Sequence, residues 1–235
     1  MNTTNFPNGI TNNKRQNVLG DLKNTDPTSY HTFFNDFDTF DSTQWNITTT
    51  EAGAGSSTEV INNEDGGILL VTNDDADNDN DFIQLAKETF KFESGKKLFF
   101  KARFRVSDAT ESDFAIGLQI TDTSPLSVSD GVFFQKDDGD ALLDFYIKKD
   151  STATTSTAIA TIVDNTYITV GFLYDGSNLI KYYAGTNSKN PTELGNSVVT
   201  NLPDDEEMTI SFGIQNGEAV AKSMSIDYIF VAKER

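Results

Sequence analysis

The fold is decided by residues 97–121, KLFFKARFRVSDATESDFAIGLQIT. Apolar side chains recur at every second position from 98 to 106, and again from 114 to 120. Successive side chains of a β-strand point to opposite faces, so this period of two indicates a strand with one face on a core and the other in solvent. The stretch therefore predicts two half-buried strands joined by a short polar loop.

The same pattern recurs along most of the chain. Further strands are expected at positions 45–50, 60–61, 68–71, 82–86, 132–135, 143–148, 168–174, 179–183, 208–214 and 224–230. The separators DDGD at 137–140 and DGSN at 175–178 contain Gly and are typical of hairpin turns. Residues 151–157, rich in Ser, Thr and Ala, are expected to form a solvated loop. So many short strands with almost no helical periodicity predict an all-β fold, an antiparallel β-sandwich or jelly roll.

The last strand follows the same alternation. Strict alternation places Met224, Ile226, Tyr228 and Phe230 on one face. First and last strands often neighbour each other in β-sandwiches, so residues 34–40 are expected to pair with residues 225–231.

The first part of the chain has a different composition. We divide the chain into an extended N-terminal arm, residues 1–32, and a β-sandwich, residues 33–235. The arm is rich in Asn and Thr and has too few apolar residues to fold alone. It is expected to stay mobile or to order against a partner, with Phe6, Val18 and Leu19 as anchors.

Composition restricts the class of partner. The 235 residues carry a formal net charge of −18 and no Cys, which excludes disulfides and thiolate metal sites. So acidic a surface repels phosphate, and we expect no nucleic-acid binding. The excess of acidic residues has three possible explanations: solubility, adaptation to a salty medium, or binding of divalent cations. No apolar run is long enough for a bilayer, and residues 1–20 lack the apolar core of a signal peptide. We therefore expect synthesis in the cytoplasm, no conventional export and no membrane partner.

Catalytic constellations are difficult to find. His31 is the single His and is expected to be a linker residue, so Ser-His and Cys-His nucleophiles have no base. Hydrolysis of a glycoside needs two carboxylates about 5–10 Å apart. The acidic residues instead gather in loops at 74–81, 137–140 and 204–207. The sequence predicts no catalytic residues, no cofactor and no enzyme.

The strongest metal motif lies in the first acidic loop. Asp77, Asp79 and Asp81 have the spacing of the opening ligands of a calcium loop, and Glu88 falls at the twelfth position. An EF-hand loop requires Gly at its sixth position, where this chain has Phe82. We therefore assign no metal site, and a looser oxygen-lined site between loops remains an alternative.

Carbohydrate binding would use exposed aromatic rings with polar groups around them. Alternation places Tyr174 and Tyr182 in the core, and Trp45 is also expected there. Tyr146 and Tyr183 point the other way and are the better candidates, although an outward Tyr is often a cross-strand packing partner. The sequence alone assigns no ligand-binding residue.

Five segments carry a resemblance to a known family: TNFPNGITN at 4–12, HTFFNDF at 31–37, DFAIGLQ at 113–119, DGVFF at 130–134 and KDDG at 136–139. They resemble small virion proteins of tailed bacteriophages that infect marine bacteria. The resemblance implies a lectin-like jelly roll of the concanavalin or laminin-G type on the particle exterior, as a capsid decoration or fibre protein. It implies no catalytic residues.

The leading hypothesis is therefore a non-enzymatic structural component of a phage particle. It would be a capsid decoration protein, made in the host cytoplasm and anchored by residues 1–32 to capsid or tail proteins, plausibly as a homotrimer. The alternative is a tail-fibre or receptor-binding module that recognises a host surface glycan. A polysaccharide hydrolase is a third hypothesis.

Overall fold

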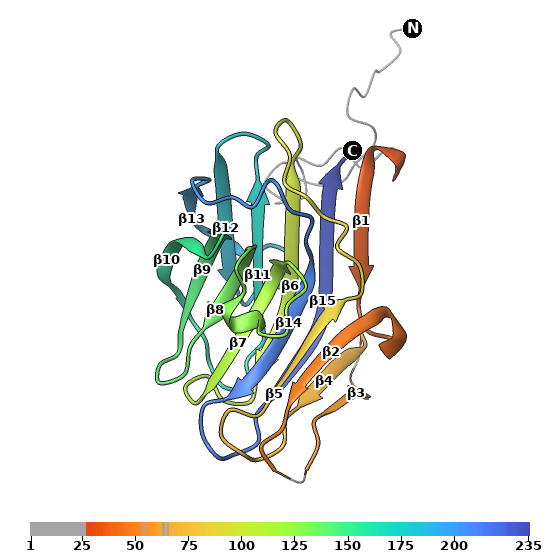
Figure 1. Cartoon of the computed structure of the whole chain (residues 1–235), viewed down its shortest axis with the longest axis vertical. Helices are drawn as coiled ribbons and strands as arrows, with labels where there is room; N and C mark the ends of the chain where they lie inside the picture. Colours follow the sequence, from red (N-terminus) through yellow and green to blue (C-terminus); the bar gives the residue numbers. More distant parts are fainter. Residues whose placement is uncertain (1–26, 54, 63, 65) are drawn as a thin grey trace, which may run out of the picture.

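The computed structural model describes residues 27–53, 55–62, 64 and 66–235. Two antiparallel β-sheets pack face to face and form a sandwich (Figure 1). This confirms the predicted all-β fold. The expected anchors Phe6, Val18 and Leu19 lie outside the described residues.

The first sheet has eight strands. Its order is β13 (Thr192–Val198), β12 (Leu179–Gly185), β11 (Ile168–Tyr174), β6 (Leu98–Val106), β15 (Ser223–Glu234), β4 (Ile68–Thr72) and β3 (Thr58–Asn62), with β1 (Tyr30–Asn35) also beside β15.

The second sheet has seven strands. Its order is β10 (Thr152–Thr161), β9 (Leu142–Lys149), β8 (Gly131–Lys136), β7 (Ser112–Gln119), β14 (Thr209–Asn216), β5 (Asn80–Leu85) and β2 (Trp45–Thr50). In the described part of the chain, the 3₁₀ helix η2 (Pro27–Ser29) precedes β1, and the 3₁₀ helices η3 (Ser42–Gln44) and η4 (Pro125–Ser127) lie in connections between strands. Among the described residues, no helix is long and apolar enough to cross a membrane.

Aromatic side chains fill the space between the sheets. Phe172 of β11 is fully buried at the centre of this core. Its ring centroid lies 5.2 Å from Phe100, 5.9 Å from Phe145, 6.3 Å from Phe92 and 6.4 Å from Phe134. Because Phe100 belongs to the first sheet and Phe134 and Phe145 to the second, this cluster joins the two layers.

The two strands predicted from residues 97–121 are β6 and β7. They lie in different sheets, so the loop between them carries the chain from one layer to the other. β7 is buried on both faces rather than one, because Leu126 and Val128, in and beside η4, pack with Phe133 over the outer face of the second sheet. The predicted turns at 137–140 and 175–178 do join β8 to β9 and β11 to β12.

Two segments differ from their predictions. Residues 151–157 were expected to form a loop, but residues 152–157 belong to β10, an exposed edge strand that pairs with β9. Thr and Ser suit an exposed strand, so their composition alone does not separate it from a loop. The N-terminal strand begins at Tyr30, so the last three residues assigned to the arm belong to the first sheet. The first and last strands are neighbours as expected, but residues 30–35 pair with residues 229–234, so the expected pairing of 34–40 with 225–231 holds only for Phe34 and Asn35.

Candidate functional site

A β-bulge in β15 produces the main surface feature of the first sheet. β15 pairs with β6, and the register shifts by one residue between Ile226 and Tyr228, which leaves Asp227 as the extra residue. An extra residue reverses the alternation of every side chain that follows it. Ile226 therefore faces the core, whereas Tyr228 and Phe230 face outward. The predicted shared face of these residues is wrong for this reason.

Beyond the bulge lies a cleft with a volume of about 550 Å³. This is within the range of ligand-binding pockets. We call it the β15 cleft; it is lined by Phe34, Asp36, Gly66, Lys101, Arg103, Ser188, Lys189, Asp227, Tyr228 and Phe230.

Arg103 and Asp227 form an ion pair in the β15 cleft. The Arg103 guanidinium also lies over the ring of Tyr167, 4.2 Å from its centroid. Its Nε is buried and has no hydrogen-bond acceptor among the described residues. A buried N–H without an acceptor is unfavourable, so Arg103 retains unused hydrogen-bonding capacity.

Lys101 lies beside Arg103 on β6 and is only 8% exposed. Its Nζ donates a hydrogen bond to the carbonyl oxygen of Lys189 at 3.0 Å and lies 5.0 Å from the ring centroid of Tyr228. Burial lowers the pKa of Lys101 to about 8. Tyr228 donates to the carbonyl oxygen of Ser188, and burial raises the pKa of Tyr228 to about 12. Perturbed groups in a concave site mark a candidate binding site.

Phe34 gives the β15 cleft an exposed aromatic wall. Its side chain is 60% exposed, and its ring meets Phe230 edge-on at 6.4 Å between centroids. The cleft thus brings aromatic surface beside Lys101, Arg103 and Lys189.

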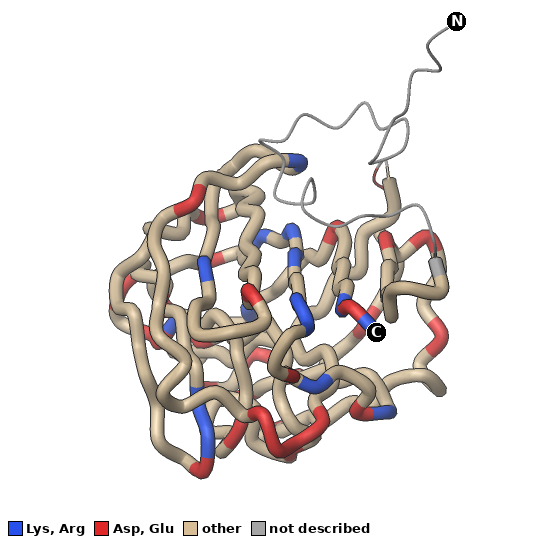
Figure 2. Tube along the Cα trace, turned by 90° about the horizontal axis from the view of Figure 1, so that it is seen from above, with Lys and Arg blue, Asp and Glu red and all other residues tan. Residues whose placement is uncertain are grey.

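The charge of this region contrasts with that of the molecule. Three cationic and two acidic side chains line the β15 cleft, whereas the chain has a net charge of −18. Figure 2 shows several Lys and Arg segments near the middle of the molecule and much of the Asp and Glu in loops at its margin. An anionic ligand is therefore favoured at the cleft over most other parts of this surface.

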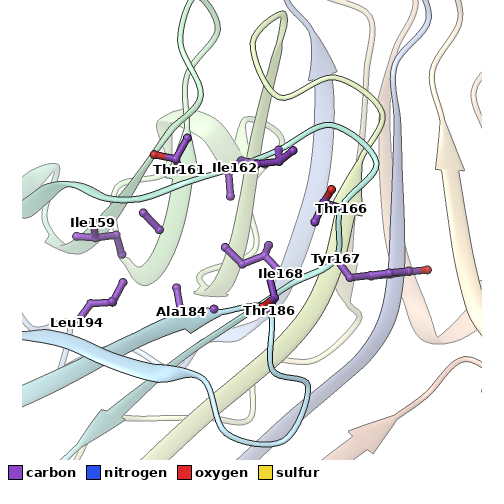
Figure 3. Close-up of a pocket in the computed structure, with 12 residues that line it drawn as sticks. Ile159, Thr161, Ile162, Thr166, Tyr167, Ile168, Ala184, Thr186 and Leu194 are labelled. Carbon is purple, nitrogen blue, oxygen red and sulfur yellow. The ribbon is translucent and has the colours of Figure 1, made fainter.

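A second cavity of about 240 Å³ opens between the edges of the two sheets. Figure 3 shows labelled side chains around it from both edges, among them Ile159, Ile168 and Leu194. Its lining has no charged residue. Because few polar groups converge on it, it offers less basis for specific recognition than the β15 cleft.

The aromatic candidates from the sequence are divided between core and surface. Trp45 and Tyr174 are buried in the core, and Tyr182 packs against it, as expected. Tyr146 lies on the outer face of the second sheet, where it stacks on Phe133 at 5.3 Å. Tyr183 lies on the outer face of the first sheet with Phe99 and Leu173.

His31 is not a linker residue. It lies in β1, and its ring stacks on Phe90 at 4.5 Å between centroids. Burial, with the positive charges of Arg235 and Lys233, lowers the pKa of His31. The side chain therefore belongs to the packing of the first sheet against its neighbours.

The acidic motif of the β4–β5 loop does not act as one unit. Asp77 is exposed and Glu88 accepts a hydrogen bond from Thr121 N, whereas Asp79 and Asp81 are fully buried. Burial, and then the neighbouring Glu59, raises the pKa of Asp81 to about 8.

The alternation of residues 98–106 puts Lys101 and Arg103, which lie between the apolar positions, on the outer face, where the structure has them, but it does not assign them to a site. The missing information was the bulge. The Asp at position 227, between Ile226 and Tyr228, interrupts an otherwise apolar run and is the single local signal of it.

No family model and no curated protein matches the chain. Several solved structures, however, are similar to the chain in fold. A Shewanella oneidensis protein of unknown function is 20% identical, with a TM-score of 0.61 over 88% of this chain and 87% of that one. An endo-1,3-β-glucanase from Streptomyces sioyaensis is 12% identical, with a TM-score of 0.61 over 89% and 98%. Peanut lectin is 12% identical, with a TM-score of 0.58 over 87% and 97%.

These similarities correct the prediction that the chain is not an enzyme. Besides the glucanase, an endo-β-1,4-glucuronan lyase from Trichoderma reesei shares the fold, with 12% identity and a TM-score of 0.55 over 85% of this chain and 94% of that one. Enzymes as well as lectins have this architecture, so the fold gives no reason to exclude catalysis. At these identities the similarity establishes the fold alone: the chain is a lectin-like jelly roll.

Proposed function

We propose that the chain is a lectin-like module that binds an acidic saccharide in the β15 cleft. The observation that carries the proposal is the bulge at Asp227, which turns Tyr228 and Phe230 to the same face as Lys101 and Arg103. Aromatic rings offer apolar faces to sugar rings, and Lys and Arg form charge-assisted hydrogen bonds with carboxylates. Proteins that share this fold include a lectin, a glucanase and a glucuronan lyase, which supports a saccharide as the ligand.

The test is calorimetric titration of the full-length protein with an oligoglucuronate and with a neutral cello-oligosaccharide of the same length. We expect the oligoglucuronate to bind more tightly. Phe34→Ala removes the exposed aromatic wall and Lys189→Glu reverses an exposed charge, and each is expected to weaken binding about tenfold, or about 1.4 kcal/mol. Lys87→Glu makes the same charge change at an exposed position outside the cleft.

Binding of the oligoglucuronate should also weaken as the pH rises from 7 to 9, because Lys101, with a pKa of about 8, loses its proton in this range. Arg103 stays charged and Tyr228, with a pKa of about 12, stays neutral. The proposal fails if neither saccharide binds, or if Lys87→Glu weakens binding as much as Lys189→Glu. Reducing ends measured after the titration report any cleavage.

A second proposal concerns where the protein acts. The resemblance to phage virion proteins includes segments of the arm and of the sandwich, and supports a structural role on the exterior of a phage particle. We propose a trimeric capsid decoration protein, anchored to capsid or tail proteins by residues 1–32. The alternative tail-fibre role is compatible with a saccharide ligand from the host surface.

Deletion of residues 1–26 tests this second proposal and leaves every described strand intact. We expect the truncated protein to fold but to be missing from purified particles, while full-length Phe34→Ala still assembles. Incorporation of the truncated protein at the normal level would refute anchoring by the arm.

A further inference from the structure

Three carboxylates converge at the corner of the sandwich where β2 and β5 of one sheet approach β3 and β4 of the other. Glu51 directly follows β2, Asp74 follows β4, and Asp79 precedes β5. One oxygen from each lies within 4.8 Å of the others. The lower part of Figure 1 shows these strand ends together. The three residues, which we call the corner triad, come from two sequence segments.

The ladder between β2 and β5 explains this convergence. Thr49 pairs with Asp81 and Thr50 with Asn80, so the next residues along are Glu51 and Asp79. Thr49 Oγ1 donates to Asp81 Oδ1 at 2.9 Å. Since alternate residues of a strand share a face, Asp81 lies on the same side of β5 as Asp79.

The backbone holds two of the carboxylates in place. Asp79 is fully buried and accepts hydrogen bonds from Ala52 N at 2.6 Å and Ala76 N at 3.1 Å. Glu51 Oε1 accepts from both the N and the Oγ of Ser57 at 2.6 Å. These bonds orient the side chains and leave Glu51 Oε2 unused.

Gly55 allows Asp74 to approach. A Cβ atom added at Gly55 would coincide with the Asp74 carboxylate. A residue without a side chain is therefore required where the loop after β2 covers Asp74.

Buried acceptors without donors give an independent indication of a ligand. Asn73 is 3% exposed, yet its Oδ1 accepts no hydrogen bond among the described residues, and neither does the buried Glu51 Oε2. Each such buried oxygen is unfavourable by about 1–3 kcal/mol. Asn73 Nδ2 donates to the carbonyl oxygen of Asp79 at 2.9 Å, which places this amide against the triad.

The negative charge is not compensated by neighbouring cations. None of the triad residues forms an ion pair with a Lys or Arg of the described part of the chain. Like charges held this close repel one another unless a cation lies between them. Oxygen ligands without imidazole or thiolate suit a hard cation such as Ca²⁺, which accepts six to eight of them.

We propose that the corner triad binds one Ca²⁺ through Glu51, Asp74 and Asp79, and that the free Oδ1 of Asn73 completes its coordination directly or through water. This site fixes the corner where the two sheets meet. It is separate from the saccharide proposal, because none of its residues lines the β15 cleft. The sequence alone led us to assign no metal site and to keep an oxygen-lined site between loops as the alternative. The present proposal adopts that alternative.

The test uses full-length protein treated with a chelator and then thermally unfolded with and without 1 mM Ca²⁺. A cation that binds the folded state alone stabilises it, and we expect the melting temperature to rise by about 5 °C. Mg²⁺ at the same concentration is expected to act less, because it gives up its hydration water reluctantly. Calorimetric titration should give one Ca²⁺ per chain.

Asp74→Asn is the informative variant, because it removes a charge without changing the shape of the side chain. We expect it to weaken Ca²⁺ binding at least tenfold and to remove most of the thermal shift. Asp75→Asn, at the exposed neighbouring position, should keep both. Glu51→Gln provides a second variant. The proposal is overturned if Ca²⁺ does not shift the wild-type melting temperature, or if Asp74→Asn and Asp75→Asn respond equally.

Discussion

Phe172→Ala is expected to lower the free energy of unfolding by about 3–5 kcal/mol. The side chain is fully buried, and four aromatic rings, from both sheets and from the β5–β6 connection, surround it within 6.4 Å. Removal of the ring exchanges these contacts for a cavity that rigid neighbouring strands cannot close. Urea unfolding monitored by Trp45 fluorescence would measure the change as a lower midpoint with an unchanged slope.

Phe34→Ala is the matched control for this substitution. It removes the same ring from a position that is 60% exposed, so the free energy of unfolding should change by less than about 1 kcal/mol. Equal effects of the two substitutions would mean that the aromatic cluster does not dominate the stability of the sandwich.

Asn216→Ala is expected to destabilise the protein by about 3 kcal/mol through lost hydrogen bonds rather than lost volume. The fully buried Asn216 side chain donates to the carbonyl oxygens of Asp74 at 2.7 Å and Ala76 at 2.8 Å. It also accepts from Asn73 Nδ2 at 3.1 Å and Lys222 N at 3.0 Å. Alanine would remove the partner of Lys222 N and of the Asp74 carbonyl oxygen, whereas Asn73 Nδ2 would keep its bonds to the carbonyl oxygens of Asp79 and Ile214.

The loss of stability in Asn216→Ala is measured by chemical denaturation. A chelator is present, so that a bound cation does not contribute to the free energy of unfolding. Asn196→Ala, at an exposed position of β13, is the comparison and should leave the free energy of unfolding within about 0.5 kcal/mol of wild type. A loss at Asn216 no larger than that at Asn196 would show that water replaces the network without cost.

Local pattern was sufficient for much of the architecture. The alternation of β6 and β7 and the Gly-containing turns before β9 and β12 are properties of a few consecutive residues, and the sequence displays them directly. β10 was missed because exposed strands and loops share the same polar residues. The arm boundary was placed late because the pairing of Tyr30 with Glu234 joins the two ends of the chain.

The candidate sites depend on information that is not local. In the β15 cleft, Phe34 and Tyr228 come from opposite ends of the sequence, and a single extra residue decides that Tyr228 faces outward. In the corner triad, Glu51 meets Asp74 and Asp79 through strand register. The acidic motif at Asp77 drew attention to the correct loop, although Asp77 itself is exposed.

The pairing of β1 with β15 also determines how the protein responds to force. Tyr30, at the start of the described chain, lies opposite Glu234, next to the last residue. Tension applied between these two points acts across the first rung of an antiparallel ladder and opens its hydrogen bonds one after another. β1 would therefore peel away at low load while the rest of the sandwich stays folded, so this pair of ends is a mechanically weak point of the molecule.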